Sequence, residues 1–221
     1  MSLVRHAKFS NFYEVAHPLI QHKLTCLRDR RTSKKEFSEL VEEITMLMAY
    51  EATKDLPLTL QEIETPLERC KMPLLAGLDP VIMPILRAGL GMVNGMLRLI
   101  PTARVAHIGL SRNEKTLEPE FYYFKVPPRS AERQIFICDP MLATGGTAAY
   151  ALTKLKELGI KKLTFVSIIA SPVGVEHLFH EHPDVTVLSA KLDRELNQSG
   201  YILPGLGDAG DRLYGTCSTA A

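Results

Sequence analysis

The stretch with the clearest chemical potential covers residues 135–147, where an apolar segment leads to Asp139 and then to a turn of small residues. The turn ends in four residues just before an expected helix: Thr144, Gly145, Gly146 and Thr147. Free backbone amides and the dipole at a helix N-terminus favour a bound anion, and glycine lets the main chain approach it closely. The residues therefore predict a phosphate cradle, with Asp139 at the strand end where open α/β sheets bind ligands.

Two other phosphate-binding motifs are excluded. No lysine follows the glycines of this turn, so the GxxxxGK[ST] loop of P-loop nucleoside triphosphatases is absent. Residues 205–210 read GLGDAG and match GxGxxG, but a dinucleotide-binding fold needs a strand before this motif and an acidic residue about 20 positions after it. The sequence ends at residue 221, which leaves no room for that arrangement.

The elements that would position the cradle follow from the hydrophobic pattern. Short apolar runs predict buried strands over residues 81–86, 104–110, 134–138, 163–170 and 185–188. A capping box of Ser33 and Glu36 starts a helix that runs to about Lys54, and further helices are expected over 89–99, 147–158 and 173–180. This alternation indicates an α/β fold with a roughly five-stranded parallel sheet flanked by helices.

The domain organisation is simple. No Gly-, Ser- or Pro-rich linker and no internal repeat divides the chain, so residues 1–221 are interpreted as one domain. Residues 113–133 are polar and contain Pro119, Pro127 and Pro128 beside an aromatic patch at 121–124. Such a long and ordered-looking segment predicts a projecting loop or hairpin arm.

The composition is that of a globular protein, with 46% hydrophobic and 23% charged residues. Lys and Arg number 26 against 25 Asp and Glu, so the basic excess of a general nucleic-acid binder is missing. Arg87, Asn94 and Arg98 interrupt the most apolar window, which argues against a membrane span, and the N-terminus lacks the apolar core of a signal peptide. Four cysteines without a CxxC pair predict free thiols and a cytoplasmic location.

The run from Asp139 to Thr147 resembles the signature with which type I phosphoribosyltransferases bind phosphoribosyl diphosphate (PRPP). Three further blocks resemble those of uracil phosphoribosyltransferases, in that family's order: 84–91 (PILRAGLG), 112–119 (RNEKTLEP) and 200–211 (GYILPGLGDAGD). The likeness extends from residue 17 to residue 215. It implies the type I phosphoribosyltransferase fold with a small hood from the chain ends. The implied reaction converts uracil and PRPP to UMP and pyrophosphate in pyrimidine salvage.

The resemblance also implies the site residues. Asp139 would contact the ribose hydroxyls and stabilise an oxocarbenium-like transition state, and Arg87 and Arg112 would hold the pyrophosphate, so these three are the expected catalytic residues. PRPP would be bound by the same three residues and by Pro140, Met141, Leu142, Ala143, Thr144, Gly145, Gly146, Thr147 and Asp208. Uracil would be bound, mostly through the main chain, by Ile202, Gly207, Asp208 and Ala209.

Mg²⁺ is the implied cofactor. Most type I enzymes carry two adjacent acidic residues where this chain has Asp139 and Pro140, so the ion is expected to bind chiefly through PRPP and water, and no metal site of the protein itself is predicted. The resemblance further suggests GTP as an allosteric activator and a homodimer or homotetramer. No nucleic-acid or membrane partner is expected, and no side chain stands out as the acceptor of the uracil N1 proton.

The sequence leaves two alternative functions open. A type I enzyme for another base, such as a purine, would keep the cradle and differ in the strip 201–211. A regulator on the same fold, which senses nucleotides or binds RNA without turnover, would show a basic groove. The formal net charge of +1 and the presence of Asp139, Arg87 and Arg112 speak against the regulator.

Two charged clusters are interpreted as solvated. His177, His180 and His182 lack the HExxH spacing of a zinc site and lie at an expected helix end. A basic turn precedes and enters the first long helix, with Arg28, Arg30, Arg31, Lys34 and Lys35. The tail 216–221 extends past the resemblance and has no predicted role.

Overall fold

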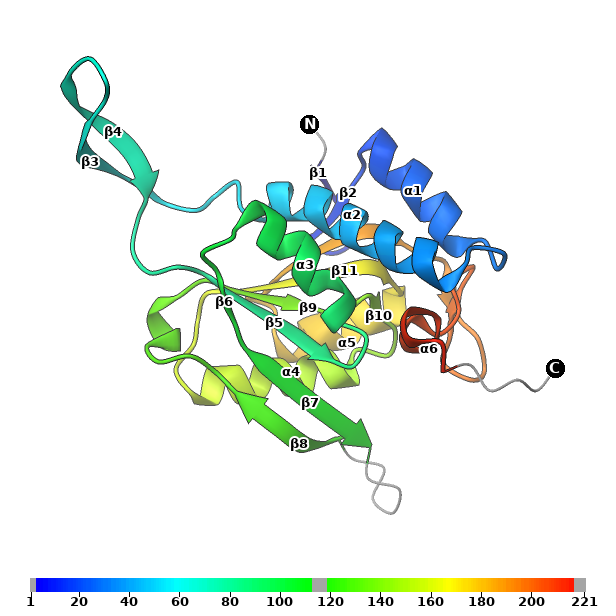
Figure 1. Ribbon diagram of the computed structural model, residues 1–221. Helices are drawn as coiled ribbons and strands as arrows, with labels where there is room; N and C mark the ends of the chain where they lie inside the picture. The colour runs from blue at the N-terminus through cyan, green and yellow to red at the C-terminus, as the bar shows by residue number, and fades with distance from the viewer. Residues whose placement is uncertain (1–2, 113–118, 217–221) are drawn as a thin grey trace.

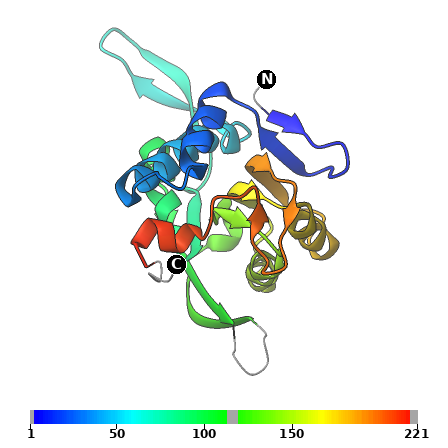
Figure 2. The ribbon, with the colours of Figure 1, turned by 90° about the vertical axis from the view of Figure 1, so that its right-hand side faces the viewer.

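The computed structural model describes residues 3–112 and 119–216 and has a central sheet with helices on both faces (Figure 1, Figure 2). The strands are β1 (Leu3–Arg5), β2 (Phe12–Val15), β3 (Leu58–Glu64), β4 (Arg69–Leu75), β5 (Val81–Leu86), β6 (Arg104–Val105), β7 (His107–Arg112), β8 (Pro119–Lys125), β9 (Ile135–Cys138), β10 (Met141–Leu142), β11 (Leu163–Ala170), β12 (Thr186–Leu192), β13 (Glu195–Leu196) and β14 (Ile202–Leu203). The helices are α1 (Pro18–Arg28), α2 (Lys34–Ala52), α3 (Leu90–Leu99), α4 (Gly146–Glu157), α5 (Pro172–Glu181) and α6 (Ala209–Tyr214), with a 3-10 turn at Ser130–Glu132. The expected α/β class is confirmed.

The main sheet has the strand order β1-β2-β12-β11-β9-β5-β7-β8, with β6 paired to β5 and β10 paired to β11. The five expected strands form its parallel core, β12, β11, β9, β5 and β7. β2 extends the parallel array beside β12, while β1 and β8 add antiparallel edges. The carboxyl ends of the core strands therefore meet at one edge, which is where α/β folds bind ligands.

The single strand predicted over residues 104–110 is divided into β6 and β7, and Pro84 of the neighbouring strand explains the division. The Ala106 amide donates to the Ile82 carbonyl at 2.9 Å. In a parallel ladder the next bond on that side would run from the amide of residue 84 to the Ala106 carbonyl. Proline has no N–H, so this bond cannot form and the ladder is interrupted at Ala106.

Two apolar layers hold the helices to the sheet, because side chains alternate between its faces. In β9, Phe136 and Cys138 join the layer that contains the buried residues of α1, α2 and α3. Ile135 and Ile137 join the layer of α4 and α5. The predicted capping box at the start of α2 is confirmed, since both of its hydrogen bonds are present.

Two hairpins extend from this body. β7 and β8 pair with each other, and the residues that join them, 113–118, lie outside the described residues. The segment expected as an arm thus contains a sheet strand, β8, while Ser130 and Arg133 near its end are buried against the body. β3 and β4 form a second hairpin that pairs only with itself and stands away from the body in both views (Figure 1, Figure 2). No strand was predicted for its residues.

The two ends of the chain pack against each other. Arg212 of α6 donates to the carbonyls of Leu27 and Asp29, each at 2.7 Å, and its guanidinium lies 4.2 Å from the centre of the Phe37 ring. These contacts fix α6 against α1 and α2.

Among the described helices, none combines the length and the apolar character that crossing a bilayer requires.

Candidate functional site

Three predicted site residues stand at the carboxyl ends of adjacent strands. Arg87 follows β5, Asp139 follows β9, and Arg112 is the last residue of β7. The strand order β9-β5-β7 places these positions side by side along the sheet edge. The turn after β5 packs closely on the end of β9, because a Cβ added at Gly89 would lie 2.3 Å from the Cys138 carbonyl oxygen. Only glycine permits this approach.

The loop after Asp139 has the form of an anion cradle. β10 pairs with the end of β11, and Gly145 caps α4 in the left-handed conformation, with φ of 84°. The backbone amides from Ala143 to Ala148 have no acceptor among the described residues. Such unpartnered amides at a helix N-terminus are the donors that bind phosphate. The predicted PRPP-loop residues, 140–147, thus run from the end of β9 through β10 to the first residues of α4.

The Asp139 carboxyl group is half-buried at the base of this turn. Its Oδ1 accepts a hydrogen bond from the Met141 amide at 3.3 Å. Burial raises the pKa of Asp139 to about 7, against the lowering effect of the Met141 amide and with a further rise from the charge of Asp208. The group therefore changes charge near neutral pH.

The strip predicted to bind uracil lies against the turn that carries Arg87. Asp208 caps α6 by accepting from the Asp211 amide at 2.8 Å. The Arg87 guanidinium lies 3.8 Å from the Asp211 carboxylate, and the Tyr214 hydroxyl donates to the Arg87 carbonyl at 2.9 Å. The structure thus brings Arg87 and Asp208 into one neighbourhood, and the charge of Asp208 also acts on Asp139.

A largely buried ion pair fixes the main chain of this strip. Arg28 donates to both carboxylate oxygens of Asp193, at 2.6 and 2.7 Å, and to the Gly205 carbonyl at 2.6 Å. Asp193 also accepts from the Gly205 amide at 3.0 Å. The prediction of a solvated turn was wrong for Arg28, because its guanidinium compensates a buried carboxylate.

The prediction of a solvated cluster was wrong for His182 as well. This residue is buried, with Nε2 2.9 Å from the Ala149 carbonyl oxygen and 3.1 Å from the Thr153 hydroxyl. The ring therefore links the end of α5 to α4 through hydrogen bonds.

Within the part of the chain that the structure describes, no three His, Cys, Asp or Glu side chains are arranged to hold a metal ion.

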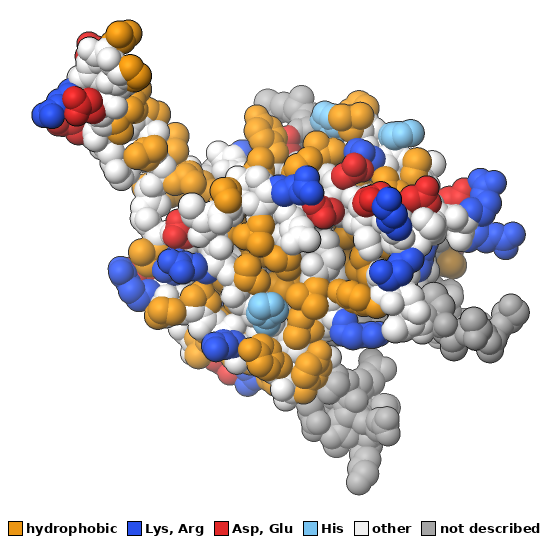
Figure 3. Space-filling model, in the orientation of Figure 1, with side chains coloured by type: hydrophobic (Ala, Val, Ile, Leu, Met, Phe, Trp, Pro, Cys, Tyr) orange, Lys and Arg blue, Asp and Glu red, His pale blue; other side chains and the backbone are white. Residues whose placement is uncertain are grey.

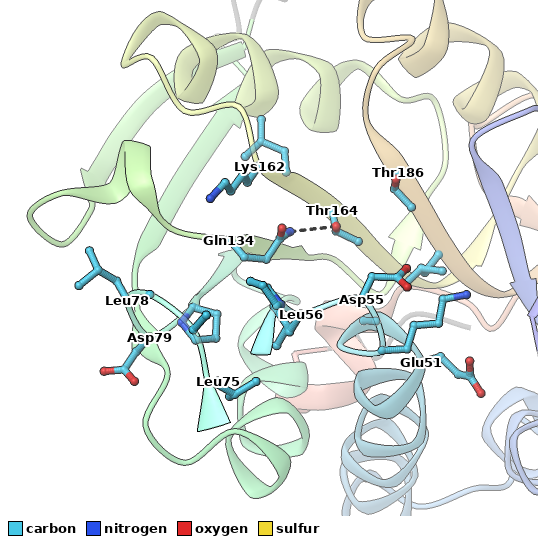
Figure 4. Close-up of a pocket in the computed structure, with 18 of the residues that line it drawn as sticks. Glu51, Asp55, Leu56, Leu75, Leu78, Asp79, Gln134, Lys162, Thr164 and Thr186 are labelled. Atoms are coloured by element: carbon cyan, nitrogen blue, oxygen red, sulfur yellow. Dashed lines mark hydrogen bonds between the residues drawn. The ribbon is translucent and has the colours of Figure 1, made fainter. Parts of the chain in front are cut away.

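A cavity of about 770 Å³ lies near the opposite edge of the sheet, beside the root of the β3–β4 hairpin (Figure 4). Gln134, Thr164 and Thr186 reach it from near the starts of three strands, and the Gln134 amide nitrogen donates to the Thr164 hydroxyl at 3.0 Å. None of the predicted site residues lines it. Since the ligands of such sheets bind at the carboxyl edge, this cavity is separate from the cradle.

The residues that support the cradle from behind were not predicted. The Ser171 hydroxyl donates to the Ala143 carbonyl at 2.6 Å, and a Cβ added at Gly174 would lie 2.3 Å from that same oxygen. A serine before proline is a signal for a helix start, and Ser171 does cap α5. That local signal carries no information about a partner 28 positions away.

Comparisons with known proteins agree with this geometry. The family model described as uracil phosphoribosyltransferase matches residues 14–216. A uracil phosphoribosyltransferase from Fervidobacterium nodosum is 56% identical over 204 residues, which cover 92% of this chain and 99% of that relative. The solved structure of the AQ2163 protein from Aquifex aeolicus is 38% identical, has a TM-score of 0.87, and covers 94% of this chain and 99% of its own.

A more distant structure shares the fold. The adenine phosphoribosyltransferase of Trypanosoma brucei, solved in complex with AMP, pyrophosphate and ribose-5-phosphate, has a TM-score of 0.56 and covers 86% of this chain and 87% of its own. Its sequence is 12% identical, so this likeness concerns the fold alone. The expected type I phosphoribosyltransferase fold is confirmed.

Substitution of Gly145 by alanine is expected to weaken the binding of ribose 5-phosphate by a factor of about ten or more. A residue with a Cβ in the left-handed conformation costs roughly 1–2 kcal/mol. The added Cβ would also lie 2.6 Å from the Gly174 carbonyl oxygen, so the loop must shift and its amides lose their alignment. Titration calorimetry with the wild type and Gly145→Ala measures the difference.

Gly159→Ala is the matched control. Gly159 also has positive φ, at 75°, but nothing lies within 4 Å of a Cβ added there, and it follows the far end of α4. Its variant should therefore bind like the wild type. Equal weakening by both substitutions would contradict the assignment of the cradle.

Proposed function

Since the chain belongs to the uracil phosphoribosyltransferase family, we propose that it transfers the phosphoribosyl group of PRPP to uracil and forms UMP and pyrophosphate. The bond from ribose C1′ to the pyrophosphate oxygen breaks, and a bond from C1′ to uracil N1 forms while N1 loses its proton. The chain is thus a pentosyltransferase of pyrimidine salvage.

The observation that carries this proposal is the row of unpartnered amides from Ala143 to Ala148 beside the Asp139 carboxylate. The amides would bind the 5′-phosphate that PRPP and UMP share. Asp139 would accept hydrogen bonds from the ribose hydroxyls and stabilise the positive charge that develops at C1′. The two features together match a phosphorylated ribose better than a free anion.

The leaving pyrophosphate gains negative charge as its bond to C1′ breaks, and Arg87 and Arg112 would hold it. Both occupy the ends of neighbouring strands, β5 and β7. Arginine suits this role because its guanidinium donates two parallel hydrogen bonds to phosphate and keeps its charge. The contact of Arg87 with Asp211 links the pyrophosphate side of the site to the uracil side.

Uracil would be bound by the main-chain donors and acceptors of Ile202, Gly207 and Ala209. Asp208 would contact both the base and PRPP. The Arg28–Asp193 pair supports this role, because it holds both the amide and the carbonyl of Gly205 within the same strip. A fixed row of backbone donors and acceptors can reject a base that presents the wrong edge.

We propose that Mg²⁺ is held in the site chiefly through PRPP and water. The residues fit a cation held in this way, since Asp139 at the strand end is followed by Pro140 and not by a second acidic residue. Asp139 and Asp208 are the carboxylates that would accept hydrogen bonds from the water ligands of the ion. Bound there, Mg²⁺ would supply positive charge against the leaving pyrophosphate.

A lid over the site would come from within the segment 113–133, of which Pro119–Lys125 form strand β8 and Ser130 and Arg133 are buried against the body. An oxocarbenium-like species must be kept from water, and a mobile cover is a common solution. The segment starts directly after Arg112, the residue proposed to hold pyrophosphate. Residues 113–118 of this lid lie outside the described part of the chain.

The protein would work in the cytoplasm. Cys26, Cys70 and Cys138 are free thiols, as expected in a reducing compartment. Cys217 lies outside the described residues.

The oligomer would be a homodimer or homotetramer in which the β3–β4 hairpin contacts a second copy of the chain. An isolated two-stranded hairpin is marginally stable in water. Apolar side chains are exposed along this hairpin: Leu58, Leu60, Leu67, Met72, Leu74 and Leu75 (Figure 3). Symmetric pairing of identical chains is the commonest way to cover such a surface.

The proposed reaction is tested by pyrophosphate release from PRPP and Mg²⁺ with uracil, cytosine, orotate, adenine and hypoxanthine, each with and without GTP. Turnover with uracil alone is expected, together with a higher rate when GTP is present. Turnover with another base would overturn the role of the strip 201–211. Binding of PRPP without turnover of any base would favour a regulator. A rate with uracil that is the same with and without GTP would contradict the role of GTP as an activator.

The acid limb of the pH profile is expected to report on Asp139. Its pKa is raised to about 7, so the carboxyl group is neutral below that pH and can neither accept both hydroxyl hydrogen bonds nor stabilise positive charge. The value of kcat/KM for PRPP should therefore rise through a pKa near 7 as the pH increases. Asp139→Asn should be about a hundredfold slower and should lack this limb. An identical limb in Asp139→Asn would assign the titration to PRPP itself.

The hairpin interface is tested by the double variant Leu58→Asp, Leu60→Asp, which places two charges on one face of β3. Light scattering should show a loss of the oligomer. Leu158→Asp is the control, because Leu158 is also exposed but lies at the end of α4. A monomeric wild type, or an oligomer that survives the double variant, would contradict the assignment.

A further inference from the structure

Helix α5 lies directly behind the phosphate cradle. The approach is so close that a Cβ added at Gly174 would lie 2.3 Å from the Ala143 carbonyl oxygen. From the other side, a Cβ at Gly145 would lie 2.6 Å from the Gly174 carbonyl oxygen and 3.1 Å from the His177 Cβ. The conformation of the cradle therefore depends on groups that α5 presents.

The carbonyl groups of the cradle residues 142–145 each have a partner in α5, at its cap, or in α4. The Leu142 carbonyl accepts from the Ser171 amide at 2.9 Å, and the Ala143 carbonyl accepts from the Ser171 hydroxyl at 2.6 Å. The Gly145 carbonyl accepts from the Ala149 amide at 2.8 Å, in the first turn of α4. These three carbonyls are held by residues that also build the starts of the two helices.

The Thr144 carbonyl is held differently, by a single side chain. His177 Nδ1 lies 3.0 Å from this oxygen. A carbonyl only accepts, so Nδ1 carries the proton and donates it. On the other side of the ring, Nε2 lies 3.1 Å from a carboxylate oxygen of Glu181, one turn further along α5. A carboxylate also only accepts, so both contacts are hydrogen bonds when both ring nitrogens carry protons, and together they then fix the orientation of the ring.

The direction of each carbonyl fixes the direction of the next amide. In a trans peptide the C=O and the following N–H point in opposite directions from one rigid plane. The hydrogen bond from His177 to the Thr144 carbonyl therefore turns the Gly145 amide away from α5, toward the open face of the cradle. The Gly145 amide is one of those without an acceptor among the described residues.

We infer that His177 is a positioning residue for phosphate binding, which holds the Thr144–Gly145 peptide so that the Gly145 amide donates to the 5′-phosphate of PRPP and UMP. Without the imidazole, this peptide can rotate about the bonds that join it to the Cα atoms of Thr144 and Gly145. Thr144 lies in the turn, and Gly145 has no Cβ to restrict its backbone angles. The loop then spends less time with its amides aligned. The inference rests on the proposed function for the identity of the ligand.

The test compares His177→Leu with His177→Asn. Leucine removes the donor, whereas the Asn side-chain nitrogen occupies the δ position and can replace Nδ1. In His177→Leu, KM for PRPP and the dissociation constant of UMP should rise about fivefold to tenfold, as expected for one hydrogen bond, while KM for uracil stays unchanged. His177→Asn should stay within about twofold of the wild type for all three.

Glu176→Gln is the matched control. Glu176 lies on the same helix and pairs with Lys8, away from the cradle, so its variant should behave as wild type. If His177→Leu fails to fold, His177→Ala carries the same expectation. Unchanged PRPP and UMP constants in the variant without the donor would overturn the inference, as would equal losses in the leucine and asparagine variants.

Binding of ribose 5-phosphate by the same variants separates this inference from the proposed function. That ligand carries the phosphate but neither the base nor the pyrophosphate. If the wild type shows no turnover with uracil, the proposed function fails, yet the ratio of ribose 5-phosphate affinities between His177→Leu and His177→Asn still decides the role of His177.

Discussion

The constraint on which this structure depends is a mismatch in backbone hydrogen bonding between residues 143 and 148. The amides of this segment have no acceptor among the described residues, whereas the carbonyls of Leu142 to Gly145 are all taken up by α5 or by the start of α4. A donor left without a partner costs roughly 1–3 kcal/mol when it is removed from water. A phosphate resolves the mismatch at once, because its oxygens accept several hydrogen bonds and its charge suits the helix dipole.

In the proposed reaction, the rest of the molecule would arrange a sugar, a leaving group and a base around that phosphate. The strand order β9-β5-β7 sets Asp139, Arg87 and Arg112 along one edge, although they are distant in sequence. The chain ends are joined to each other and to this edge. Arg212 binds the carbonyls of Leu27 and Asp29 at the end of α1, Arg28 with Asp193 fixes Gly205, and Tyr214 of α6 binds the Arg87 carbonyl. In the proposed reaction, substrate binding and catalysis would therefore involve both chain ends and the centre of the sheet. The cavity beside the β3–β4 hairpin has no share in this arrangement.

The features that the sequence predicts are those encoded locally. The five core strands, the capping box at Ser33 and the loop from Asp139 to Thr147 each depend on residues within a few positions of one another. The errors and omissions depend on partners far away in the chain. Arg28 and His182 were expected in solvent because their partners, Asp193 and Ala149, cannot be seen from their neighbours in sequence. The split between β6 and β7 comes from Pro84 on another strand, and the β3–β4 hairpin lacks the buried face by which strands are usually recognised.

The most direct test of the central claim is the response of individual backbone amides to UMP, followed by ¹H–¹⁵N correlation NMR on the assigned protein. Amides that donate to a phosphate move strongly downfield. We expect the largest shifts at Thr144, Gly145 and Gly146, with smaller ones along the strip 202–209 and none around the cavity near Gln134 and Thr164. Binding of UMP that leaves the amides of 143–148 unchanged, or that shifts the cavity residues instead, would contradict the central claim.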